Sequence, residues 1–292
     1  MSKQIEYAFN YCERVSKKRA KNFYYAFRTL PIQKRQAIYA IYAFCRYCDD
    51  VTDGNLSIGE KKQVLVKIRA SLNNLELAGD DPVFTALRET ISEFEIPTVY
   101  FEELMNGFEM DLIKNRFENF EELRNYCFCV ASSVGLICLE IFGYDSDSNA
   151  KTHAIDLGIG MQLTNIMRDV KEDGGRGRIY IPLEEMVRHE YTESELMVGL
   201  MNDKYHSLMD AQAKRARKYL DSGHQLSPLV KIESRPCVAI LHSLYSAILN
   251  RIIDNDYQVF GNRIGLNNME KIILTVRLWA STLIIKALNL KK

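Results

Sequence analysis

Helical periodicity runs through almost the whole chain with few interruptions. Proline, which breaks helices, occurs only six times in 292 residues, and between the prolines apolar residues recur three or four positions apart. The pattern predicts about ten helices. Their ranges are 5–30, 32–53, 57–77, 82–94, 98–114, 119–142, 149–173, 193–222, 236–260 and 268–290. With no strand pattern, linker or repeat between them, we expect an all-α fold with a single domain over residues 1–292.

The composition excludes several classes of protein. The chain is 47% hydrophobic and 26% charged, which is typical of a globular protein and not of a disordered one. Its 38 basic and 38 acidic residues balance, which argues against a nucleic-acid-binding protein with a broad basic face. No uncharged apolar stretch reaches the roughly 18 residues of a membrane span, and residues 1–10 lack the apolar core of a signal peptide. We therefore expect a cytoplasmic protein whose seven cysteines are reduced.

Two carboxylates lie one helical turn apart at the predicted end of one helix. Asp49 and Asp53 are four residues apart, which places their Cβ atoms roughly 5–6 Å apart on one face, with Arg46 one turn earlier. Like charges repel, and the macrodipole disfavours anions at a helix C-terminus. A bound cation would offset both effects, and oxygen ligands without histidine or cysteine indicate Mg²⁺ or Mn²⁺. The alternative is a solvated helix end before the Gly54-Asn55 turn.

A second pair with the same spacing ends another predicted helix. Asp169 and Asp173 follow Gln162 and Asn165, and the four side chains fall at i, i+3, i+7 and i+11, which is one helical stripe. An ordinary surface helix could carry a polar stripe. A stripe made of two amides followed by two acids is less expected on such a helix. Two such pairs predict carboxylate walls that face each other across a helical bundle. They would hold several Mg²⁺ ions and, through them, a diphosphate.

At these motifs the chain resembles the squalene/phytoene synthase family, the head-to-head prenyl synthases. The resemblance covers nearly the whole chain. It rests on the segments 22–27, 40–53, 126, 130–135, 162–173 and 177–182, which include both aspartate motifs. It implies an all-α isoprenoid-synthase bundle with a central cavity. It also implies Mg²⁺-dependent condensation of two prenyl diphosphates through a cyclopropylcarbinyl diphosphate of the presqualene diphosphate type.

The resemblance also implies roles for individual residues. The implied metal ligands are Asp49, Asp53, Asn165, Asp169 and Asp173. Beside these aspartates, the implied catalytic residues are Arg46 and Tyr126. The arginines implied to contact diphosphate are Arg46, Arg168, Arg178 and Arg263. The other residues implied to bind substrate or line its tunnel are Phe23, Phe27, Tyr42, Val130, Gln162, Leu163, Asn165, Tyr180 and Tyr245.

The chain departs from the family pattern near its start. Many relatives carry Ser-x-Ser just before the phenylalanine that matches Phe23, where this chain has Ala20 and Asn22. Ala20 cannot donate a hydrogen bond to a phosphate, whereas Asn22 keeps an amide donor. We expect activity to survive, because the metal ions would carry most of the diphosphate charge.

Several alternatives remain for the product. The resemblance favours farnesyl diphosphate and a C30 product, which would be squalene, hydroxysqualene or dehydrosqualene. The alternative is phytoene made from two geranylgeranyl diphosphates. Reductive squalene formation would require NADPH, for which the sequence carries no nicotinamide motif. A non-catalytic assembly factor is an alternative of another class, against which the two intact aspartate pairs argue.

The last predicted helix, residues 268–290, is strongly apolar but is interrupted by Arg277 and Lys286. Core packing is the first expectation for this segment. Peripheral contact with a membrane, into which a greasy product would leave, is the alternative. The sequence leaves the oligomeric state open.

Overall fold

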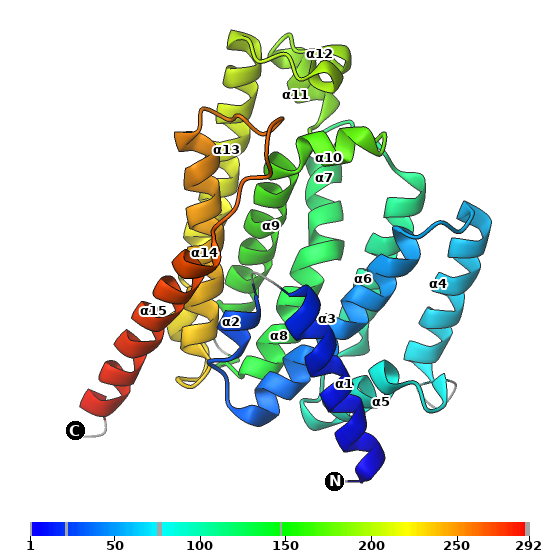
Figure 1. Ribbon diagram of the computed structural model, residues 1–292, viewed down its shortest axis with the longest axis vertical. Helices are drawn as coiled ribbons and strands as arrows, with labels where there is room; N and C mark the ends of the chain where they lie inside the picture. The colour runs from blue at the N-terminus through cyan, green and yellow to red at the C-terminus, as the bar shows by residue number, and fades with distance from the viewer. Residues whose placement is uncertain (1, 21–22, 75–77, 147, 290–292) are drawn as a thin grey trace.

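The computed structural model is a bundle of helices, most of which run up and down the long axis (Figure 1). It describes residues 2–20, 23–74, 78–146 and 148–289, and side chains as far as residue 280. The helices are α1 (Lys3–Arg19), α2 (Tyr24–Phe27), α3 (Ile32–Thr52), α4 (Ile58–Asn73), α5 (Pro82–Glu93), α6 (Thr98–Ile113), α7 (Phe120–Cys127), the π-helical turn η2 (Phe128–Ser132), α8 (Ser133–Phe142), α9 (Ala150–Arg168), α10 (Val170–Gly175), α11 (Leu183–Arg188), α12 (Glu193–Val198), α13 (Asp203–His224), the 3₁₀ turn η3 (Ser227–Leu229), α14 (Arg235–Asp254) and α15 (Asn268–Asn289). These residues contain no β-strand, only an isolated bridge between Tyr144 and Val230. The predicted all-α fold is therefore confirmed.

Several predicted helices were too long. The range 5–30 divides into α1 and α2, and α1 ends where the Ala20 N–H bonds to the Ser16 carbonyl. The range 193–222 divides at Gly199, which takes up the left-handed conformation that ends α12. Asn202 then caps α13 by accepting a hydrogen bond from the Tyr205 N–H.

Two other predicted helices also end early. The range 236–260 stops at Asp254, because Asp256 and Tyr257 have positive φ angles that a helix cannot continue through. The range 149–173 bends at Asp169, between α9 and α10. The short helix α11 was not predicted at all.

Helix α9 lies at the centre of the bundle because glycines let its neighbours approach closely. A Cβ atom at Gly158 would lie 2.7 Å from the Ser132 Cα in η2. One at Gly160 would lie 2.9 Å from the Leu220 backbone nitrogen in α13. The Ser132 hydroxyl also donates a 2.7 Å hydrogen bond to the Ile155 carbonyl. These contacts fix the height and rotation of the helix that carries the amide and acid stripe.

Helix α15 packs along one side only, against α14 and α2, and it extends away from the bundle in Figure 1. Its other side leaves five large apolar side chains exposed, which are Met269, Ile272, Ile273, Val276 and Trp279. The expectation that this segment belongs to the core is therefore wrong for that side. Membrane contact by this segment stays a prediction.

Two other helical stretches, Phe120–Phe142 and Arg235–Asp254, pass a length and composition test for membrane spans. About half of each is buried inside the bundle. Buried core helices pass the same test, so this is weak evidence for a span.

We predict that Gly158→Ala lowers the free energy of unfolding by about 1–3 kcal/mol, because the new methyl group meets backbone that cannot move aside. Gly59→Ala is the matched control, since its Cβ meets nothing within 4 Å. Alanine in a helix is more stable than glycine by roughly 0.5–1 kcal/mol, so this variant should keep or slightly raise the free energy of unfolding. Urea unfolding followed by circular dichroism measures both. A Gly158→Ala protein as stable as the wild type would contradict the close packing of α9.

Candidate active site

A cavity of about 390 Å³ lies inside the bundle. Its lining runs from Asp49 to Ile38 along α3 and from Asn165 to Ala154 along α9, which is a rise of eleven residue steps in each case and therefore about 16 Å of helix. Its polar end holds Asp49, Asp111, Tyr126, Asn165 and Tyr245, and its apolar end holds Ile38, Phe142, Leu226 and Val238. The cavity therefore suits a ligand with a charged head and a long apolar tail.

The first acidic wall is the C-terminal turn of α3. The Arg46 guanidinium donates to Asp50 Oδ1 at 2.9 and 2.7 Å and lies 3.6 Å from Asp49 Oδ2. Asp53 is the C-cap residue of the helix. The spacing of four residues therefore places Asp49 and Asp53 together at the polar end, as the helical pattern predicts.

The second acidic wall is the bend between α9 and α10. Asp169 accepts bonds from two arginines: the Arg168 Nε lies 2.9 Å from Oδ1, and the Arg263 Nε and Nη2 each lie 2.8 Å from a carboxylate oxygen. Arg168 is itself buried. Asp173 lies one turn further along, and its backbone N–H bonds to the Asp169 carbonyl.

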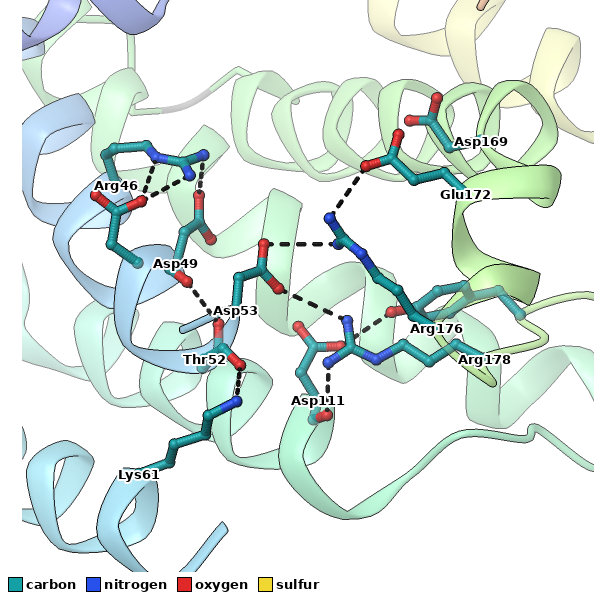
Figure 2. A network of polar contacts seen from close by, with 12 residues as sticks. Arg46, Asp49, Thr52, Asp53, Lys61, Asp111, Asp169, Glu172, Arg176 and Arg178 are labelled. Atoms are coloured by element: carbon teal, nitrogen blue, oxygen red, sulfur yellow. Dashed lines mark hydrogen bonds and ion pairs between the residues drawn. The ribbon is translucent and has the colours of Figure 1, made fainter. Parts of the chain in front are cut away.

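Two arginines join the walls. The Arg176 guanidinium lies 3.6 Å from Asp53 Oδ2 and 3.1 Å from Glu172 Oε1. The Arg178 Nη1 lies 4.0 Å from Asp53 Oδ1. Figure 2 shows Arg176 between the two carboxylates, with Arg178 directly beside it. The two acidic pairs therefore face each other across the polar end of the cavity.

The carboxylates differ in how easily they carry charge. Burial raises the pKa of Asp49 to about 7; Arg46 opposes this shift, and Asp53 adds to it. Burial, together with the negative charges of Asp169 and Glu172, raises the pKa of Asp173 to about 7. Burial acts in the same direction on Asp169, but hydrogen bonds from Arg168 and Arg263 outweigh it and lower its pKa. Asp169 is thus kept charged by arginine hydrogen bonds, whereas Asp49 has only the longer 3.6 Å ion pair with Arg46.

The donor set fits hard divalent cations such as Mg²⁺. It consists of carboxylates and the Asn165 amide, whose Oδ1 is buried and accepts no hydrogen bond from any described residue. Within the described part of the chain, no three acidic, histidine or cysteine side chains converge closely enough to hold a metal alone. Ligands would have to be shared with a substrate, and Mg²⁺ commonly binds through one or two carboxylates plus phosphate oxygens.

Most of the residues implied by the resemblance meet at this site. Those that line the cavity are Phe23, Phe27, Tyr42, Asp49, Tyr126, Val130, Gln162, Asn165 and Tyr245. Arg46, Arg168, Arg178 and Arg263 surround its polar end through the carboxylates, and the Tyr180 ring stacks on Tyr126 at 5.2 Å. Ala20 is buried, and Asn22 lies outside the described residues.

Three residues differ from expectation. Tyr180 does not line the cavity, although its ring stacks on Tyr126, which does. Leu163 is buried in the core and does not line the cavity, because one residue further along α9 turns its side chain about 100° away from Gln162. Asp111 lines the polar end of the cavity, and no sequence motif marks it as a site residue. It is the only aspartate in α6 and lacks the paired spacing of the other aspartates, so only the fold brings it here.

Comparisons with known proteins agree with this geometry. The family model described as "Squalene/phytoene synthase" matches residues 16–270. The chain belongs to the squalene/phytoene synthase family. It is therefore a prenyltransferase that condenses prenyl diphosphates head to head, in a family whose catalysis depends on a divalent metal.

Named relatives and solved structures of the squalene/phytoene synthase family cover almost the whole chain. A phytoene synthase of Arthrospira platensis is 35% identical over 280 residues, covering 91% of this chain and 90% of the relative. A 15-cis-phytoene synthase of Synechocystis sp. is 34% identical over 288 residues, with coverage of 94% and 85%. A dehydrosqualene synthase crystal structure superimposes with a TM-score of 0.84 at 31% identity, with coverage of 95% and 97%. The crystal structure of squalene synthase HpnC from Alicyclobacillus acidocaldarius superimposes with a TM-score of 0.80 at 27% sequence identity, covering 88% of this chain and 97% of the other.

The raised pKa of Asp49 predicts how the stability of the metal-free protein depends on pH. An acid with a raised pKa in the folded state stabilises the fold at low pH, and this contribution is lost as pH rises from about 4 through about 7. Asp49→Asn removes the unfavourable charge and should raise the Tm by about 2 °C at pH 8, and by less at pH 5.5.

Asp50→Asn is the matched control, because Asp50 is the neighbouring acid and is paired with Arg46. Its loss should not raise the Tm at either pH. Differential scanning calorimetry in the presence of a chelator measures both variants. An equal effect of Asp49→Asn at the two pH values would contradict the assigned burial of its charge.

Proposed function

We propose that the chain condenses two geranylgeranyl diphosphates, through prephytoene diphosphate, to phytoene. The observation that carries this proposal is the set of curated relatives. Phytoene synthases from cyanobacteria and plants are 34–36% identical over 88–95% of this chain. They support the C20 substrate better than the farnesyl diphosphate that the sequence favoured.

The polar end of the cavity suits two diphosphate groups. Arg46, Arg168, Arg178 and Arg263 can donate charge-assisted hydrogen bonds to phosphate oxygens. Asp49, Asp53, Asn165, Asp169 and Asp173 would hold Mg²⁺, or Mn²⁺ in its place. Bound divalent ions would supply Lewis-acid stabilisation of the negative charge on the leaving diphosphate.

The apolar part of the cavity suits the prenyl chains and excludes water. Phe23 stacks on Phe27 and on Tyr245, with ring centroids 6.0 Å apart in each pair. Aromatic faces attract cations, especially where water is excluded. These rings would stabilise the allylic cation left by the first ionisation while the double bond of the second substrate attacks it.

The second ionisation and rearrangement end with the loss of a proton in phytoene formation, which requires no reductant. On this proposal NADPH is not needed. A second candidate is a C30 product from farnesyl diphosphate, which the likeness to the dehydrosqualene synthase structure supports. Squalene itself would require NADPH.

Product analysis separates these functions. Purified protein with Mg²⁺ is incubated with geranylgeranyl or farnesyl diphosphate, each with and without NADPH. The products are then extracted and their masses are determined by mass spectrometry. We expect a C40 hydrocarbon from geranylgeranyl diphosphate, independent of NADPH. A C30 product made in preference to the C40 product would contradict the C20 proposal, and no product from either substrate would favour an assembly factor.

The aspartate pairs provide a test of the metal assignment. Asp53→Asn and Asp173→Asn should each lower turnover by about 100-fold or more, because charge stabilisation at the leaving group is lost. Circular dichroism should show unchanged helical content. Asp254→Asn, at the exposed end of α14, is the control and should keep full activity; full activity in the two site variants would contradict the assignment.

A further inference from the structure

Asp111 joins three elements at the polar end of the cavity. Its Oδ1 accepts a 2.9 Å hydrogen bond from the Tyr126 hydroxyl in α7 and a 3.1 Å bond from the Tyr180 hydroxyl. Its backbone carbonyl accepts a 3.1 Å bond from Arg178 Nη2. Figure 2 shows Asp111 beside Arg178 and close to Asp53. The Asp111 carboxylate therefore holds two tyrosine hydroxyls, while its backbone carbonyl holds one of the arginines between the acidic walls.

The two tyrosines form a rigid aromatic group around this carboxylate. Their rings stack at 5.2 Å, and Phe117 packs on both, at 5.2 Å from Tyr126 and 5.6 Å from Tyr180. The packing fixes the ring planes, so only the hydroxyl hydrogens keep a choice of direction. A phenol has a single hydrogen to donate. The Tyr126 hydroxyl lies 2.9 Å from Asp111 and 3.4 Å from the Tyr180 oxygen, so the carboxylate is its nearer and charged acceptor, as it is the acceptor for Tyr180.

We propose that Asp111 is a positioning residue of the head-to-head reaction, which holds the phenolic hydrogens so that the oxygen of Tyr126, which lines the cavity, serves as an acceptor toward it, while Tyr180 supports Tyr126 by stacking on it and sharing the same carboxylate oxygen. Lone pairs and ring faces turned this way would stabilise positive charge on the prenyl chain. Reversed hydroxyls would instead point hydrogens at that charge. The inference rests on the head-to-head reaction of the proposed function, and it does not depend on the length of the prenyl chain.

The environment of the tyrosines agrees with this role. Burial and the neighbouring Asp111 charge raise the pKa of Tyr126 well above its usual value, and the same two causes raise the pKa of Tyr180. Both rings therefore remain neutral phenols. The direction of their hydroxyl hydrogens then decides the electrostatic field at this end of the cavity.

Substitution by leucine and by asparagine tests the proposal. Asp111→Leu has a similar shape but no acceptor, and we expect kcat to fall about 10-fold to 100-fold, the range typical of groups that orient a functional side chain. The KM for prenyl diphosphate and the Mg²⁺ concentration for half-maximal rate should stay within about twofold, since the proposed role of Asp111 is exerted through the tyrosine hydroxyls that it holds and not through a bond to either ligand. The share of product released as cyclopropylcarbinyl diphosphate should rise.

Asp111→Asn is the conservative variant. Its amide oxygen can accept the same two hydroxyl hydrogens, so we expect it to recover most of the activity lost in Asp111→Leu. A metal ligand or a charge-dependent base would not be replaced in this way. An Asp111→Asn protein as inactive as Asp111→Leu, or one with a shifted Mg²⁺ requirement, would overturn the positioning role.

A double-mutant cycle and a matched control complete the test. If Asp111 acts through the tyrosines, Asp111→Leu combined with Tyr180→Phe and Tyr126→Phe should lose no more activity than the double tyrosine variant. Asp156→Asn also loses a carboxylate that accepts a hydroxyl hydrogen, from Ser222, but it lies outside the cavity lining and should keep wild-type kcat. Additive losses would overturn the proposal.

The wild-type protein, assayed in parallel with both substrates, separates failure of the proposed function from failure of the proposed role of Asp111. Absence of any turnover by the wild type would overturn the proposed function itself. Normal wild-type turnover with an equally active Asp111→Leu variant would overturn only the role of Asp111.

Discussion

Repulsion between carboxylates governs the polar end of this bundle. Two aspartate pairs from different helices face one cavity, and such an arrangement requires positive charge between the walls. Arginines supply that charge in the structure. Arg168 and Arg263 hold Asp169, and Arg176 joins Asp53 to Glu172. The same guanidinium groups are suited to phosphate oxygens. Binding of a metal–diphosphate substrate would therefore exchange partners within an existing charge network and would not require a new one.

The position of this network depends on packing far from any charge. Helix α9 carries one acidic wall, and Gly158 and Gly160 let it approach η2 and α13 more closely than any larger residue would allow. The π-helical turn η2 contributes Val130 to the cavity and lies directly before α8. Such turns are often found at functional sites. The separation between a charged end and an apolar end therefore follows from how a few backbones meet, and it suits a substrate with a diphosphate head and a hydrocarbon tail.

The sequence predicted those parts of the fold and site that depend on local spacing. Long apolar periodicity identified the main helices, and the spacing of four residues placed Asp49 with Asp53 on one helical face. Periodicity failed where a backbone conformation ends a helix inside an apolar pattern, as at Gly199 and at Asp256 and Tyr257. It also could not distinguish Leu163 from its cavity-lining neighbours. Asp111 was not predicted as a site residue, because its partners Tyr126 and Tyr180 are 15 and 69 residues away along the chain. Only tertiary packing brings the three together.

On the proposed function, both acidic walls bind divalent metal together with a substrate diphosphate. The most direct measurement is a crystal structure with Mn²⁺ and a non-ionisable prenyl thiodiphosphate, with the metal located by anomalous scattering. We predict Mn²⁺ peaks beside Asp49 and Asp53 and beside Asn165, Asp169 and Asp173, joined by diphosphate oxygens, with Arg176 and Arg178 moved from Asp53 toward the ligand. A map in which the analogue occupies the cavity without Mn²⁺ at either wall would contradict the account.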